Sequence, residues 1–151
     1  MKPPAAAPAC GASTPSTPGT ASSSARSVRM RASSISRGVN LGSLDRQLVP
    51  DTIDLVTMDL SYLAVAAAVC QLDRVRLAPD AELVALVKPM FELHLDHAPR
   101  DQRAVSDALG RAAAGVDRAG WRVRGHLDSP VPGARGAVEV FLHARRASRE
   151  D

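Results

Sequence analysis

Two reactive side chains end short apolar runs of this sequence. Residues 53–59 end in Asp59, and residues 82–88 end in Lys88. Short apolar runs of this kind are typical of buried strands in a parallel sheet. Ligands of open α/β sheets bind beyond the carboxyl ends of the strands, so a carboxylate and an amine at two such ends indicate a site.

A second carboxylate, Glu139, is expected at the same edge of the sheet. It lies near the start of the last predicted strand, residues 137–144. Parallel strands bring their carboxyl ends to one edge, and an antiparallel strand begins at that edge. Asp59, Lys88 and Glu139 are therefore expected to converge, although Asp59 and Glu139 are 80 residues apart.

Lys88 is an unusual residue for this chain, which has two lysines among its 19 basic residues, the other 17 being arginines. A lysine ammonium is compact enough to approach a small reacting oxygen, and two flanking carboxylates would hold it in place. The alternative is a lysine at a strand end that extends its ammonium into solvent and pairs with a carboxylate for solubility.

The elements that must position these residues follow the order β-α-β-α-β-β. Strands are predicted over residues 53–59, 82–88, 121–127 and 137–144, and helices over 62–77 and from Asp101 or Asp96 to about 119. Pro79-Asp80 and Gly120 are expected to end the two helices, and residues 89–100 are expected to form a loop. Two helical crossovers imply three parallel strands, and the last strand should be antiparallel because no helix precedes it. The fold class is therefore α/β.

The length of 151 residues suggests one folded domain, which is expected over residues 37–146. Residues 1–36 contain no acidic or aromatic residue and are rich in Ala, Ser and Pro, so they are predicted to be a disordered tail. Residues 147–151 are expected to form a short C-terminal tail. The N-terminal tail is either a basic segment for RNA contact or a segment that binds nothing.

The chain is expected in the cytoplasm and not in a membrane. Cys10 and Cys70 are too few for a disulfide scaffold, and no apolar run approaches 18 residues. Prolines at positions 3, 4 and 8 exclude a signal peptide. His94 and His97 with Asp96 are expected to be solvated loop residues, because two histidines without a third defined ligand are a poor metal signal.

Three segments carry a family resemblance: DLVTMDLSY (residues 54–62), LVALVKPMFE (83–92) and SPVPGARGAVE (129–139). In this order they resemble motifs of the FtsJ-like methyltransferases, in the branch of TlyA hemolysin-like rRNA methyltransferases. The resemblance extends over residues 37–146 and corresponds to the C-terminal half of the family's catalytic domain.

The resemblance implies a Rossmann-like methyltransferase sheet and transfer of a methyl group from S-adenosylmethionine, typically to a ribose 2′-hydroxyl of rRNA. The family's site is a Lys-Asp-Lys-Glu tetrad, and Asp59, Lys88 and Glu139 match its last three members. Asn40, Asp59 and Leu60 are the expected cofactor contacts. Methyl transfer of this kind is an in-line displacement, in which an ammonium stabilises the negative charge that develops on the attacking oxygen.

The chain departs from the family pattern in its N-terminal part. The first lysine of the tetrad has no counterpart except Lys2, to which the role is not transferred. Residues 11–14 match the opening of the glycine-rich cofactor loop, but Pro15 and Pro18 follow. Proline removes the flexibility and the backbone N–H that such a loop needs. We hypothesise that residues 1–36 are a frame-shifted reading of the cofactor-binding half, which the DNA upstream of codon 37 would test.

Two functions remain open at this stage. The first is the activity of an S-adenosylmethionine-dependent rRNA methyltransferase, which this short chain has either retained or lost. The second is a non-catalytic remnant or interaction module, whose first strand would form an exposed apolar sheet edge that favours self-association.

Overall fold

The computed structural model describes residues 38–147, so the expectations for residues 1–36 and 148–151 lie outside the described residues. The strands are β1 (Ile53–Met58), β2 (Leu77–Val87), β3 (Trp121–Asp128) and β4 (Val140–Arg146). The α-helices are α1 (Val65–Val69), α2 (Pro89–Glu92) and α3 (Gln102–Arg118). Three 3-10 helices are added, η1 (Leu41–Ser43), η2 (Cys70–Arg74) and η3 (Ala134–Gly136).

The sheet has the order β1-β2-β4-β3. β1 and β2 are parallel, whereas β4 is antiparallel to both β2 and β3, so three strands point one way and β4 points the other. This confirms the predicted α/β class with an antiparallel C-terminal strand. The last of the described strands lies inside the sheet, and β1 and β3 lie at its edges.

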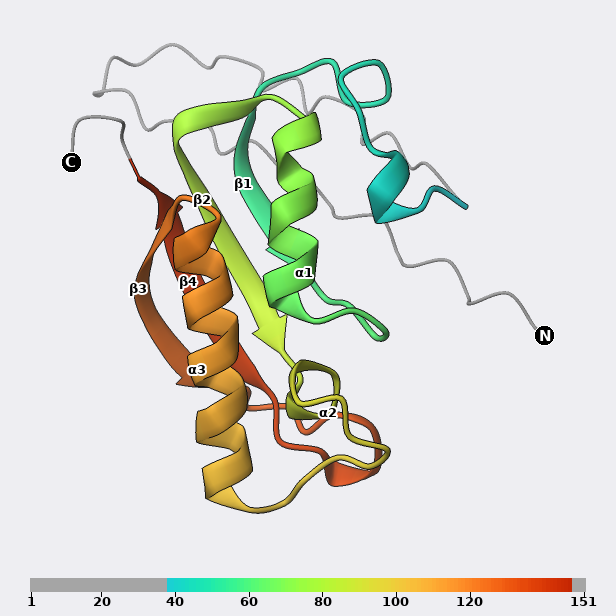
Figure 1. Ribbon diagram of the computed structural model, residues 1–151, viewed down its shortest axis with the longest axis vertical. Coiled ribbons are helices and arrows are strands. Elements are labelled where there is room, and N and C mark those ends of the chain that lie inside the picture. The colour runs from blue at the N-terminus through green and yellow to red at the C-terminus, as the bar shows by residue number, and fades with distance from the viewer. Residues whose placement is uncertain (1–37, 148–151) are drawn as a thin grey trace, which may run out of the picture.

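Both long helical segments cover the same face of the sheet, as Figure 1 shows. The core between sheet and helices is aliphatic, as the sparse aromatic content predicts, and Trp121 is its only aromatic member among residues 38–147. Its largest fully buried side chains are Leu83, Leu142, Val56, Val69, Val87, Val116 and Val140. Burial of such side chains contributes roughly 1.5–3 kcal/mol each and holds the strand ends in register.

The first helix is shorter than predicted, and the prediction that Pro79-Asp80 ends it is wrong. α1 ends at Val69 and continues as η2, which ends at Arg74, and residues 77–80 belong to β2. The register with β1 jumps from Leu77 to Glu82, so Pro79 lies in a bulge that does not need its missing N–H. Asp80 pairs there with Arg145 of β4 at 3.1 Å.

The helix after the loop agrees with the sequence pattern. Asp101 caps α3 by accepting a hydrogen bond from the Ala104 N–H at 2.8 Å, which decides between the two predicted caps. Gly120 follows the helix with a φ of 81°, a left-handed conformation that favours glycine. Within residues 89–100, predicted as loop, Pro89–Glu92 form the short helix α2, which a proline at the first helical position suits.

Candidate active site at the carboxyl edge of the sheet

Strand pairing explains why the three predicted site residues meet. Asp59 directly follows β1, Lys88 directly follows β2, and Glu139 directly precedes β4. Val87 is paired with Val140 in the antiparallel ladder, so the next residues outward, Lys88 and Glu139, face each other. β1 runs parallel to β2 on its other side and delivers Asp59 to the same edge.

The Lys88 ammonium lies between the two carboxylates. Its Nζ is 2.7 Å from Oδ1 of Asp59 and 3.9 Å from Oε1 of Glu139. The side chains of Lys88 and Glu139 are 18% and 12% exposed, whereas that of Asp59 is 70% exposed. The ammonium is thus shielded on the Glu139 side and reachable from solvent on the Asp59 side.

A tight loop places the Glu139 carboxylate. The Gly133 N–H donates to the Ala137 carbonyl at 2.8 Å, and the Ser129 N–H donates to the Glu139 carbonyl at 2.9 Å, which folds residues 129–139 back on themselves. A Cβ atom at Gly133 would lie 2.2 Å from Oε1 of Glu139. The carboxylate therefore occupies the space that a side chain at position 133 would fill.

Glu92 is a member of the site region to which the sequence assigned no role. It is the one buried charged residue of the part of the chain that the structure describes, with 4% of its surface exposed. Its carboxylate accepts a hydrogen bond from the Val65 N–H at the start of α1. Desolvation by burial raises the pKa of Glu92 above 4.5, and the hydrogen bond from Val65 and the charges of His94 and Arg111 oppose this rise.

Glu92 connects the two segments that follow Asp59 and Lys88. Asp59 is six residues before Val65, and Lys88 is four residues before Glu92. The hydrogen bond between Glu92 and Val65 therefore fixes α2 against the start of α1 and restricts both chain segments. The sequence signal was an acidic residue directly after the apolar residues Pro89, Met90 and Phe91.

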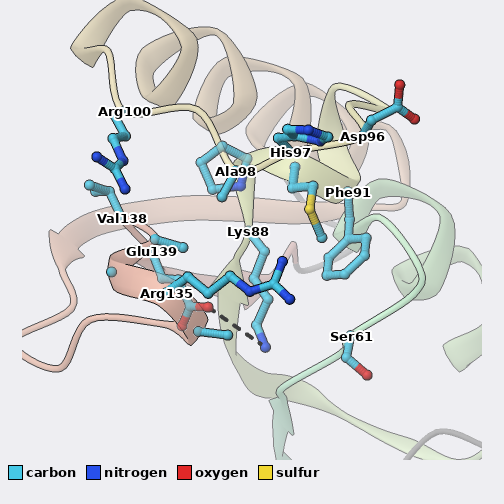
Figure 2. A pocket seen from close by; sticks show the side chains of 15 residues that line it. Ser61, Lys88, Phe91, Asp96, His97, Ala98, Arg100, Arg135, Val138 and Glu139 are labelled. Atoms are coloured by element: carbon cyan, nitrogen blue, oxygen red, sulfur yellow. Dashed lines mark ion pairs between the residues drawn. The ribbon is translucent and has the colours of Figure 1, made fainter.

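A cavity of about 640 Å³ opens beside Lys88. Lys88 and Glu139 form one part of its wall and Phe91 a second, and Arg100 and Arg135 contribute guanidinium groups (Figure 2). Met90 also lines the cavity. Its volume lies within the range of small-molecule sites, roughly 300–1,000 Å³.

The predicted cofactor contacts do not form one group. None of Asn40, Asp59 and Leu60 lines the cavity, although Asp59 contacts Lys88, which does. Asn40 uses its side chain to cap η1 by accepting a hydrogen bond from the Gly42 N–H. Arg74 of η2 donates to the Gly42 carbonyl and so ties this turn to the amino-terminal side of β2. Leu60 is 4% exposed and packs in the core.

Two other kinds of site are absent from residues 38–147. No group of three or more His, Cys, Asp or Glu side chains in this range could hold a metal ion. No helix in the same range is long and apolar enough to span a bilayer.

Sequence comparison finds relatives among rRNA methyltransferases. The 16S/23S rRNA (cytidine-2′-O)-methyltransferase TlyA of Mycobacterium tuberculosis (strain ATCC 25618 / H37Rv) is 32% identical over 114 residues, which cover 70% of this chain and 41% of TlyA. YqxC of Bacillus subtilis (strain 168), provisionally named an rRNA methyltransferase, is 30% identical over 95 residues, or 60% of this chain and 34% of YqxC. No family model matches the chain.

Solved structures share the fold. A provisionally named hemolysin from Streptococcus thermophilus superposes with a TM-score of 0.66 at 22% identity, over 72% of this chain and 41% of that protein. A second one from Lactococcus lactis gives a TM-score of 0.64 at 21% identity, over 71% of this chain and 53% of that protein. The chain thus spans less than half the length of the curated relatives that it matches.

Proposed function

The C-terminal portion of this chain belongs to the TlyA-like, FtsJ-like family of rRNA methyltransferases, and on that basis we propose that it carries the catalytic lysine of an S-adenosylmethionine-dependent rRNA 2′-O-methyltransferase. The observation that carries the proposal is the ammonium of Lys88, held between Asp59 and Glu139 beside a cavity. An RNA substrate of this class would place the chain in the cytoplasm.

Lys88 is the group that would act on the reacting atoms. An ammonium has three N–H donors, and the 2.7 Å contact with Asp59 uses one of them, whereas Glu139 attracts the ammonium from 3.9 Å without a hydrogen bond. A remaining N–H group can donate to the oxygen of an acceptor hydroxyl and stabilise the negative charge that develops there as the hydroxyl releases its proton to solvent and takes up the methyl group. A donor that is already oriented in a shielded site stabilises this charge without reorganisation, and such stabilisation accounts for much of the rate enhancement of many enzymes.

Asp59 and Glu139 would act as positioning residues for Lys88. Glu139 holds the ammonium from the more buried side, and Asp59 holds it from the exposed side. The geometry of both contacts follows from the sheet register, so the ammonium is fixed by the fold before substrate binds.

The described residues provide only part of the surroundings that S-adenosylmethionine needs. Bound in the site, this cofactor would supply the methyl group to the acceptor oxygen. Asp59 is the expected contact that lies beside Lys88, whereas Leu60 is buried in the core and the Asn40 side chain caps its own turn. Residues 38–147 therefore do not by themselves form a complete cofactor pocket.

The proposal is tested with the full chain, ribosomal RNA and S-adenosylmethionine that carries a labelled methyl group. Wild type should transfer label to RNA, and Lys88→Met should reduce the rate by roughly 10²–10³, the loss expected for one preorganised donor to a developing oxyanion. Lys2→Met, which changes the chain's other lysine, is the matched control. Failure of wild type to bind S-adenosylmethionine at millimolar concentration would refute activity of this chain.

A second candidate function is a non-catalytic interaction module. The observation that favours it is the position of β1 at an edge of the described sheet, next to β2 only. An apolar edge strand can pair with a second polypeptide, so this function predicts self-association.

A further inference from the structure

The cavity beside Lys88 contains two arginines that the proposed chemistry does not use. Arg100 lies in the segment before α3, and Arg135 lies in η3, in the loop that also carries Glu139. Among residues 38–147, neither guanidinium makes an ion pair or a side-chain hydrogen bond that would neutralise it. Arginine side chains left unpaired at a cavity are available to an anionic ligand.

The backbone presents Arg135 in a fixed way. Its φ is 58°, a left-handed conformation, and Gly136 next to it has a φ of 78°. The hydrogen bond from the Gly136 N–H to the Gly133 carbonyl at 3.0 Å closes this turn. Figure 2 shows the Arg135 side chain extending from the turn across the cavity toward Phe91.

The other wall of the cavity is apolar and aromatic. Met90 and Phe91 line it, and both are half-buried at the start of α2. Asp96 also lines the cavity, but its carboxylate points away from Lys88 and Arg135 in Figure 2. The charges of Arg100 and Arg135 are therefore not matched by a carboxylate directed at them, whereas Lys88 has two.

Resting on the proposed function, we propose that this cavity binds one nucleotide of the RNA, with its phosphate on the guanidinium of Arg135 and its base against Phe91. A planar guanidinium matches the geometry of a phosphate and binds it through paired hydrogen bonds. An aromatic side chain stacks on an unpaired base of any type. Arg100, on the far side of the cavity, supplies a second cation for the same phosphate or the next one along the strand.

This arrangement assigns separate parts of one nucleotide to separate residues. Arg135 and Phe91 bind the phosphate and the base, and the sugar between them faces the ammonium of Lys88. Arg135 and Glu139 are four residues apart in the same loop, so binding of phosphate by Arg135 and orientation of Lys88 by Glu139 depend on one local structure.

The first test measures binding of the full chain to a labelled single-stranded RNA dodecamer at several salt concentrations. Arg135→Ala should weaken binding about tenfold, the loss of a hydrogen-bonded charge pair. The slope of log affinity against log salt should fall by about 0.7, as expected for one phosphate contact on a single strand. Arg76→Ala is the control and should change neither quantity. Arg76 is exposed and precedes β2, at the end of that strand opposite to Lys88. Equal effects of the two variants would overturn the proposal.

The second test locates the base. The chain has two phenylalanines, Phe91 in the cavity and Phe141 in β4, so fluorophenylalanine labelling gives two ¹⁹F signals. Cytidine 5′-monophosphate should shift the signal of Phe91 and not that of Phe141, and Arg135→Ala should reduce this affinity to that of cytidine, which lacks the phosphate. A shift of the Phe141 signal alone, or no shift of either signal at millimolar nucleotide, would overturn the proposal.

The two proposals can fail separately. If methyl transfer depends on Lys88 but Arg135→Ala behaves as Arg76→Ala, the methyltransferase function stands and the nucleotide site is wrong. If Arg135→Ala weakens RNA and nucleotide binding but no methyl transfer occurs, the nucleotide site stands and the catalytic proposal is wrong. Thermal unfolding of each variant establishes that a loss of binding is not a loss of folding.

Discussion

The environment of Lys88 indicates that its two ion pairs serve position more than stability. The closer partner, Asp59, is 70% exposed, and water screens its attraction. Pairs of this kind contribute about 0–1 kcal/mol to folding. Lys88→Met should therefore change the free energy of unfolding by less than about 1 kcal/mol in urea denaturation, although it should slow the proposed methyl transfer by roughly 10²–10³. A much larger loss would mean that Lys88 is a structural residue.

Gly133 tests the position of Glu139. An added Cβ would meet the end of a flexible carboxylate, so Gly133→Ala should move the Glu139 carboxylate away from Lys88 and change stability little. Because Lys2 and Lys88 are the only lysines, ¹³Cε labelling gives two lysine signals, and that of Lys88 should shift. Gly125→Ala is the control, because an added Cβ there meets nothing within 4 Å, and it should leave the Lys88 signal unchanged. An unchanged Lys88 signal in Gly133→Ala would contradict the placement of Glu139.

Glu92 should make stability depend on pH in the direction opposite to that of most carboxylates. Burial raises its pKa in the folded protein above the ordinary 4.5, so the folded state binds a proton more readily than the unfolded state. Its contribution to stability is therefore fully present below pH 4.5 and falls as pH rises through the raised value.

Glu92→Gln removes this titration and keeps an oxygen for the Val65 N–H. The free energy of unfolding of Glu92→Gln minus that of wild type should therefore increase between pH 4.5 and pH 7, as measured by urea denaturation. Asp107→Asn, an exposed carboxyl group of α3, is the control. A difference that does not change over this range would show that Glu92 does not titrate as its burial requires.

At the scale of elements, α1 and α3 pack closely because glycine occurs at one contact. A Cβ at Gly115 would lie 2.3 Å from the Cβ of Ala66, so a methyl group has no room there unless one of the helices shifts. Gly115→Ala should cost about 1–3 kcal/mol by overpacking.

Gly110 provides the matched comparison on the same helix. It is exposed, and an added Cβ meets nothing within 4 Å. Gly110→Ala should stabilise the protein by up to about 1 kcal/mol, the helix preference of alanine over glycine. Thermal unfolding of both variants checks the opposite signs, and a stabilised Gly115→Ala variant would contradict the close packing of α1 and α3.

The elements also show which parts of the structure a sequence reveals. Short apolar runs predict that strands end beside Asp59 and Lys88. The cap at Asp101 is also predictable, because an aspartate can accept a hydrogen bond from a backbone N–H three residues later. The bulge at Pro79 does not follow, because pairing with β1 outweighs the local tendency of proline to end regular structure. Strand order and the role of Glu92 were also not predictable, since both depend on contacts between residues distant in sequence, such as Glu92 with Val65.

At the scale of the whole molecule, the two edges of the sheet differ in character. The edge strand β3 carries Arg122, Arg124 and His126, and charged side chains discourage pairing with another strand. β1 is mostly apolar, and Asp54 is its only charged residue. Self-association is therefore expected through β1 and not through β3.

Light scattering after size exclusion tests this asymmetry. Leu55→Lys in β1 should shift the chain toward the monomer, because a lysine on an edge strand opposes strand addition. Leu127→Lys in β3, at a residue that is 68% exposed, should have no effect. A wild-type monomer at all concentrations would exclude the edge as an association surface.

The position of β4 inside the sheet determines when the site can form. This strand must insert between β2 and β3, and its pairing of Arg145 with Glu82 closes a segment of more than 60 residues. Closing so long a loop is slow compared with forming the local β3–β4 hairpin. Asp59 and Lys88 are thus in the growing chain well before Glu139 reaches them, so during synthesis the constellation is assembled only after β4 has emerged from the ribosome.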